Sequence, residues 1–151
     1  MCDHEFALSL SVRHPDIDPS RITRALGMQP GHVWRKGEQR LDSAGDVLGG
    51  SHRASYWLCE IAPRHAFSGE RISVEGELSR VLDVLRQSAD FMQEMRRGGG
   101  ESELFVTIFT RGDLRVELLP EAAALLGRMG VAITIEIKPY VPPATEAIAS
   151  Q

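Results

Sequence analysis

The sequence is poor in cysteine, has no surplus of basic residues and contains no long apolar run. Two of its 151 residues are cysteines, Cys2 and Cys59. A disulfide between them is conceivable, but in a chain without a signal peptide both are expected to be free thiols. The formal net charge of −4 argues against binding nucleic acid through general charge, because phosphate binding relies on Lys and Arg. No apolar run approaches the roughly 20 residues of a membrane helix.

The N-terminus also lacks the features of a signal peptide. It carries acids where a signal peptide would place Lys or Arg before an apolar core, so we expect residence in the cytoplasm. A hydrophobic content of 42% and a charged content of 25% are ordinary for a globular protein. We predict one α+β domain over residues 1–138 and a mobile tail over residues 139–151, which contains three prolines and little that can pack.

Strands are predicted where apolar and polar side chains alternate with a period of two. This pattern covers residues 5–13, 55–62 and 131–138. Residues 104–110 are apolar on both faces, which predicts a strand in the interior of the sheet. A shorter strand is predicted around Val33 and Trp34.

Three helices are predicted from apolar spacing and from the residues that begin and end helices. Between residues 78 and 95, apolar side chains recur at steps of three and four, which predicts an amphipathic helix. The stretch Ser88-Ala89-Asp90 could interrupt it, because Ser and Asp side chains compete for backbone hydrogen bonds inside helices. The predicted starts are Asp18-Pro19, Ser73 and Pro120, and the predicted ends are Gly27, Gly98–Gly100 and Gly130.

The predicted order is strand, helix, strand, strand, helix, strand, helix, strand. The first six elements match a ferredoxin-like βαββαβ core, to which a helix and a strand are appended. We therefore predict an antiparallel or mixed sheet with helices on one face. Residues 38–54 are rich in Gly, Ser and charge and are predicted to form a long loop between two adjacent strands. Leu41 and Val47-Leu48 are expected to prolong those strands.

Residues spread over most of the chain resemble a bacterial family known as domain of unknown function 4279. Those that resemble its N-terminal signature are Ile22, Leu26-Gly27, Pro30, Trp34 and Gly37. Those similar to its C-terminal half are Trp57-Leu58, Leu118, Pro120-Glu121 and the final strand that Gly130 precedes. The family brings no established activity, substrate or catalytic residue. The resemblance therefore implies a small, free-standing bacterial protein and no mechanism.

Cations flank an aromatic residue where the predicted loop begins and ends. The candidate ligand-binding residues are Trp34, Arg35, Lys36, His52 and Arg53. If the loop folds back, these side chains could receive an anion, since Arg offers a planar fork of donors. The alternative is a core tryptophan at the end of a strand, followed by a solvated loop.

The predicted open face of the sheet carries small uncharged side chains, among them Ser9, Thr107 and Thr134. Such a face can leave a shallow groove for a ligand or a second subunit. The alternative is an ordinary solvated antiparallel face, on which Ser and Thr are common.

The remaining candidate chemistry is weak. The histidines lack the short spacing of zinc ligands, and Cys59 lies on an apolar strand face where we expect it to be buried and inert. We expect no metal, no cofactor and no catalytic residue. The function predicted is a non-enzymatic binding or protein-interaction module, whose partner is a second copy or another protein, not nucleic acid or a membrane. The alternative is an anion- or small-ligand-binding protein, or an enzyme, that uses the region from Trp34 to Arg53.

Overall fold

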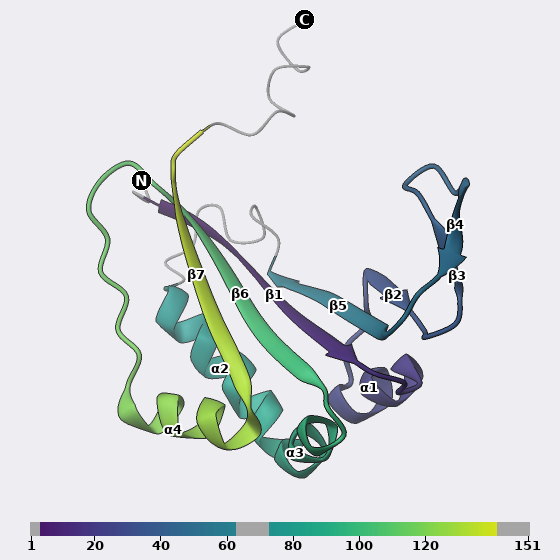
Figure 1. Ribbon diagram of the computed structural model, residues 1–151. Helices are drawn as coiled ribbons and strands as arrows, with labels where there is room; N and C mark the ends of the chain where they lie inside the picture. The colour runs from purple at the N-terminus through teal and green to yellow at the C-terminus, as the bar shows by residue number, and fades with distance from the viewer. Residues whose placement is uncertain (1–3, 63–72, 142–151) are drawn as a thin grey trace, which may run out of the picture.

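The computed structural model describes residues 4–62 and 73–141, so most of the predicted tail lies outside the described residues. Within them the chain forms a mixed α+β fold with a five-stranded sheet, a separate two-stranded hairpin and four helices (Figure 1). None of these helices has the length and apolar character of a membrane span. The elements are β1 His4–His14, α1 Pro19–Leu26, β2 His32–Trp34, β3 Gln39–Leu41, β4 Val47–Ser51, β5 Ser55–Ala62, α2 Val74–Gln87, α3 Ala89–Arg97, β6 Glu101–Thr110, α4 Pro120–Met129 and β7 Val131–Pro139.

The strand order in the sheet is β2-β5-β1-β6-β7. Neighbouring strands are antiparallel except for β6 and β7, which are parallel. The mixed sheet confirms the predicted α+β class. As predicted from its apolar character on both faces, β6 lies inside the sheet, between β1 and β7.

The core lies between one face of the sheet and the helices. Alternate residues of β1 and β6 are buried on that face, and all four helices contribute apolar side chains to the same cluster. Trp57 of β5 is completely buried there, and its indole N–H donates a hydrogen bond of 3.0 Å to the Thr23 hydroxyl. This bond joins β5 to α1. Burying one large apolar side chain stabilises the folded state by about 1.5–3 kcal/mol.

The helices begin and end where the sequence predicts. The side chains of Asp18 and Ser73 accept backbone N–H bonds at the starts of α1 and α2. Gly27 and Gly130 follow α1 and α4 with φ angles of 65° and 70°, a conformation that glycine adopts without a Cβ clash. Ser88 separates α2 from α3, which confirms the predicted interruption, and its hydroxyl donates to a carbonyl of α1 at 2.8 Å.

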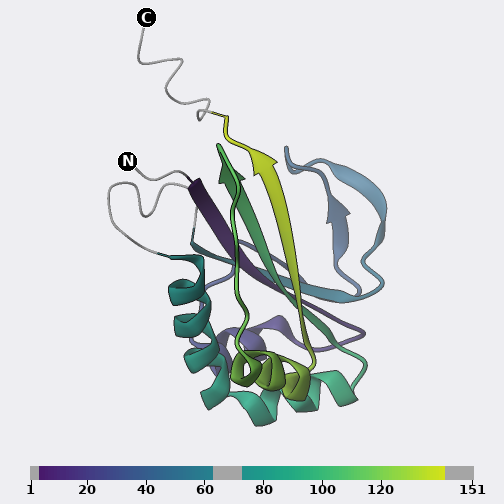
Figure 2. The same ribbon diagram turned by 90° about the vertical axis from the view of Figure 1, so that its left-hand side faces the viewer.

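The prediction for residues 38–54 is wrong in one respect. Leu41 and Val47-Leu48 do not prolong β2 and β5, because they belong to a separate hairpin formed by β3 and β4. Leu41 pairs directly with Val47 in that hairpin. In Figure 2 the hairpin and α2 lie on opposite sides of the sheet. The hairpin therefore stands on the side that carries no helix.

Candidate functional site

Among the described residues, the longest run of exposed positions lies in the β3–β4 hairpin with its two connections to the sheet, residues 35–53, here called the arm. Every residue from Arg35 to Ser51 is exposed. The arm is closed at its base by two backbone bonds of 2.9 Å, from the Gly37 N–H to the His52 carbonyl and from the His52 N–H to the Glu38 carbonyl. These bonds make the arm an ordered hairpin.

The tip of the arm is a turn built by one carboxylate. The Asp42 side chain accepts the backbone N–H groups of Ala44 and Asp46, each at 2.9 Å. The Asp42 N–H in turn donates to the Asp46 carbonyl at 2.9 Å. Gly45 has a φ of 87°, which side chains other than glycine adopt only with strain. The stretch from Asp42 to Asp46 thus encodes its own turn, since an aspartate can replace a backbone acceptor.

Three large apolar side chains of the arm face solvent. Leu41, Val47 and Leu48 are 53%, 59% and 54% exposed. Leu41 and Val47 share one face of the hairpin because they are directly paired, and Leu48, the next residue, points to the other face. Contiguous apolar patches at a protein surface often mark interaction sites, and Leu41 and Val47 lie side by side.

An aromatic stack lies at the base of the arm. The Trp34 ring stacks on His52 with a centroid distance of 4.3 Å and on Tyr56 with one of 4.6 Å, and the interplanar angles are 14° and 25°. The Arg13 guanidinium lies 5.8 Å from the centroid of Tyr56. The stack connects the arm, through His52, to β2, β5 and β1.

Ser55 fixes the same base from the core side. Its side chain is buried, and its hydroxyl donates to the Ile17 carbonyl at 2.6 Å while accepting the Lys36 N–H at 3.1 Å. It therefore bonds the first part of the arm to the turn before α1. The sequence prediction did not single out Ser55. The available signal was a polar residue at an inward position of β5, in phase with Trp57 and Cys59.

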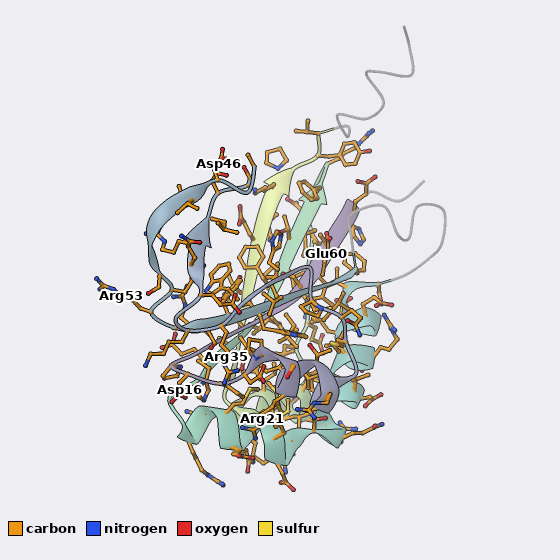
Figure 3. The ribbon with its side chains drawn as sticks, turned by 90° about the vertical axis from the view of Figure 1, so that its right-hand side faces the viewer. Asp16, Arg21, Arg35, Asp46, Arg53 and Glu60 are labelled. Carbon is orange, nitrogen blue, oxygen red and sulfur yellow. The ribbon has the colours of Figure 1, made fainter. Side chains whose placement is uncertain are left out.

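The predicted ligand-binding residues do not converge on one point. The structure brings Trp34 and His52 together as the stack. Arg35 instead reaches Asp18, with Nη1 and Oδ2 3.5 Å apart. In Figure 3, Arg53 extends away from the domain and from Arg35. The Lys36 backbone is bound by Ser55. The aromatic rings therefore lie together at the base of the arm, whereas the predicted cations lie apart from one another.

A shallow pocket of about 300 Å³ lies between the β1–α1 turn, α1 and α3. Figure 3 labels Asp16, Arg21 and Arg35 around it. Its two arginines already face acids. Arg21 lies 3.5 Å from Glu94, at the same separation as Arg35 from Asp18. Two hydrogen bonds from Ser20, from its backbone N–H and its hydroxyl, hold the pKa of Asp18 below its ordinary value, and Arg35 adds to this effect.

His14 forms one wall of this pocket and acts there as a structural acceptor. Its Nδ1 accepts the backbone N–H groups of Asp16 and Ile17 at 3.1 and 3.0 Å. The Asp16 carboxylate lies 3.4 Å from the same nitrogen. Among the described residues no buried side-chain nitrogen or oxygen lacks a hydrogen bond. The pocket lies where α1 meets α3, and its two arginines already have acidic neighbours.

The residues of the predicted interaction face lie on the side of the sheet opposite the helices. Ser9 and Thr134 are both paired with Phe105, and Thr107 lies two residues further along β6. All are half-buried, and the Thr134 hydroxyl donates to the Glu103 carboxylate at 2.9 Å. Phe105, which the prediction left out of this face, makes it more apolar than the small residues alone indicate.

One known family covers nearly all of the described residues. The family model described as Domain of unknown function (DUF4279) matches residues 4–140. The chain belongs to this family. The match confirms the resemblance predicted from the sequence and covers every strand and helix described above. No curated protein and no solved structure matches the chain.

Two remaining candidates for chemistry in this DUF4279 chain are the Cys59 thiol and a cluster of metal ligands. Cys59 is buried, as predicted, and burial, followed by the nearby Glu60 charge, raises the pKa of its thiol. A protonated buried thiol is a poor nucleophile. Among the described residues, no three His, Cys, Asp or Glu side chains gather in a way that could hold a metal ion. The arm is consequently the feature of the DUF4279 domain that most needs a functional explanation.

Proposed function

We propose that this DUF4279 domain is a binding module that holds a protein partner against its arm. The observation that supports the proposal is the exposure of Leu41, Val47 and Leu48 on an ordered hairpin that stands off the sheet. The described domain offers these side chains no cover. Placing more than half of each side chain in water forfeits the stabilisation that burial provides.

The free energy expected from burying these side chains fits a specific contact of moderate affinity. Fully burying a side chain of this size contributes about 1.5–3 kcal/mol, so covering the exposed half contributes roughly 1 kcal/mol for each. The arm is also preorganised by the Asp42 turn and by the stack of Trp34 on His52. A preorganised surface loses less conformational entropy on association. The arm thus suits a partner that presents an apolar surface.

The test compares the wild-type chain with a variant of the arm. In the arm variant, Leu41→Gln, Val47→Thr and Leu48→Gln remove apolar surface from exposed positions. The matched control, Leu118→Gln with Leu119→Gln, changes apolar side chains that are exposed elsewhere. Melting temperatures of all three proteins verify folding.

The partner is first captured by a photocrosslinking residue at position 43 in the turn, then purified and titrated by calorimetry. The arm variant should bind it at least about tenfold more weakly, since at least the partial burial of the Leu41–Val47 pair is lost. The control should bind like the wild type. Equal affinity of the arm variant and the wild type would refute the proposal.

We also propose the ferredoxin-like description for the part of the fold that contains β1, β2, β5 and β6. Its support is the order β2-β5-β1-β6 with antiparallel neighbours throughout, as in a split βαβ unit. Helix α4 and strand β7 are then the appended pair. Backbone contacts measured by nuclear magnetic resonance test this, and a direct β5–β6 pairing would contradict it.

A further inference from the structure

The outer edge of the sheet at β7 presents unused backbone groups. The Tyr140 N–H donates to the Thr110 carbonyl at 3.0 Å, in register with the parallel β6–β7 pairing. The backbone N–H and C=O groups of successive residues point to opposite sides of a strand. The even-numbered residues of β7 therefore direct these groups toward β6. Ile133, Ile135 and Ile137 consequently point their N–H and C=O groups outward. Among the described residues none bonds to these groups.

This edge has neither the short length nor the bulge that often protects an exposed edge. The β6–β7 register is continuous, so no bulge turns the strand away. Ile135 and Ile137 are 41% and 56% exposed. The strand's two charges, Glu136 and Lys138, lie 3.0 Å apart and neutralise each other. The opposite edge, β2, has only three residues, which is a common way to limit edge pairing.

We propose that β7 pairs with β7 of a second copy of the chain, antiparallel and about a twofold axis at Ile135. The edge is self-complementary in that register. Ile135 faces its own equivalent, and Ile133 of each copy faces Ile137 of the other. Every outward N–H and C=O of these three residues is then paired, and the isoleucines of both copies form one apolar row. The two sheets become one continuous sheet, an isologous arrangement.

Neighbouring registers are less favourable. An axis at Glu136 places the two Glu136 carboxylates directly opposite each other, where like charges destabilise an antiparallel pair. An axis at Ile137 sets Pro139 against Ile135, and proline has no N–H to donate. With the axis at Ile135, Pro139 falls opposite Val131 at the end of the ladder, so its missing donor ends the pairing.

The size of the contact sets the expected affinity. Pairing through one strand edge buries less than the roughly 1,200 Å² at which standard interfaces begin. The dimer should therefore be weak and should form as the protein concentration rises. It uses a different edge of the sheet from the arm, so the inference does not depend on the proposed partner of the arm.

The experiment is sedimentation equilibrium of the full chain from low micromolar to several hundred micromolar concentration. Ile135→Lys and Ile137→Lys each place a charge in the apolar row at a position already partly in water. Leu48→Lys on the arm is the matched control, because Leu48 is 54% exposed. Circular dichroism verifies that each variant folds, and Ile137→Lys, the more exposed edge position, keeps the test valid if Ile135→Lys does not fold.

The wild type and Leu48→Lys should dimerise alike, and both edge variants should dissociate at least about tenfold more readily, which corresponds to about 1.4 kcal/mol. In a Cys2→Ser background, Ile135→Cys should cross-link across the axis more efficiently than Ile137→Cys. A wild type that stays monomeric, edge variants that still dimerise, or loss of the dimer in Leu48→Lys would each overturn the proposal. More efficient cross-linking through position 137 would overturn the register.

Discussion

Replacing Ser55 by alanine tests how the arm is attached to the domain. The Ser55 side chain is 1% exposed and bonds two backbone groups, the Ile17 carbonyl at 2.6 Å and the Lys36 N–H at 3.1 Å. Without the hydroxyl, the buried carbonyl has no partner, whereas water can reach the N–H of the exposed Lys36. A buried unsatisfied group destabilises by about 1–3 kcal/mol, so we expect Ser55→Ala to lose about 2 kcal/mol. For a domain of this size the melting temperature should fall by roughly 4–8 °C.

Urea denaturation at 25 °C measures this loss directly. The exposed Ser51 of β4 provides the matched control, since Ser51→Ala should change the free energy of unfolding by less than about 0.5 kcal/mol. Hydrogen exchange adds a local measurement, because the Lys36 amide should exchange faster in Ser55→Ala. A loss of stability no larger than that of Ser51→Ala, with unchanged exchange at Lys36, would refute the reasoning.

Two further predictions follow from the titrating groups. The pKa of Asp18 is lowered in the folded protein, so its charge contributes stability above the unfolded pKa of about 3.9, and this contribution is lost as pH falls through the folded pKa. Asp18→Asn keeps a hydrogen-bond acceptor at the N-cap but removes the charge. Urea titrations should therefore show that the variant is less stable than the wild type at pH 7 and that this difference shrinks below pH 4. A difference that stays constant with pH would contradict this. Burial raises the pKa of the Cys59 thiol, so in a Cys2→Ser background a thiol-specific reagent should label the native protein far more slowly than the urea-unfolded protein. Equal labelling rates would show that Cys59 is accessible.

Much of the fold follows from patterns that a few neighbouring residues encode. The alternation in residues 5–13 and 131–138 predicts β1 and β7, and both strands are present. Helix starts and stops are equally local, since Asp18 caps α1 with its own side chain and Gly130 supplies a positive φ after α4. The α+β class follows from these elements, because an amphipathic helix and a half-apolar strand must cover each other.

The arm was harder to predict because apolar residues usually indicate buried surface. Leu41 and Val47 were therefore assigned to extensions of the sheet, whereas they pair with each other and face water. The Asp42 carboxylate that closes the turn is a recognisable signal, but it acts through hydrogen bonds within the arm. That signal indicates a hairpin without indicating which way the hairpin projects.

The candidate site depended on side-chain directions that no short pattern contains. The cations at positions 35 and 53 are the first and last residues of the arm, but one reaches Asp18 and the other extends away from the domain. Trp34 and His52 are far apart in the chain and meet only because the hairpin closes between them. Which side chains meet at such a junction is decided by the tertiary fold.

The two exposed apolar surfaces lie at opposite ends of the strand order, the arm beyond β2 and the Ile row on β7 (Figure 1). A dimer joined through β7 therefore leaves both arms free, and each can bind one partner. Two arms in one assembly raise the apparent affinity for a partner that is itself multivalent or immobilised. Ile137→Lys should then lower the apparent affinity for an immobilised partner and leave the affinity for a monomeric partner in solution unchanged. A loss of affinity in solution as well would mean that the dimer shapes the binding surface, and the arm would not be a self-sufficient site.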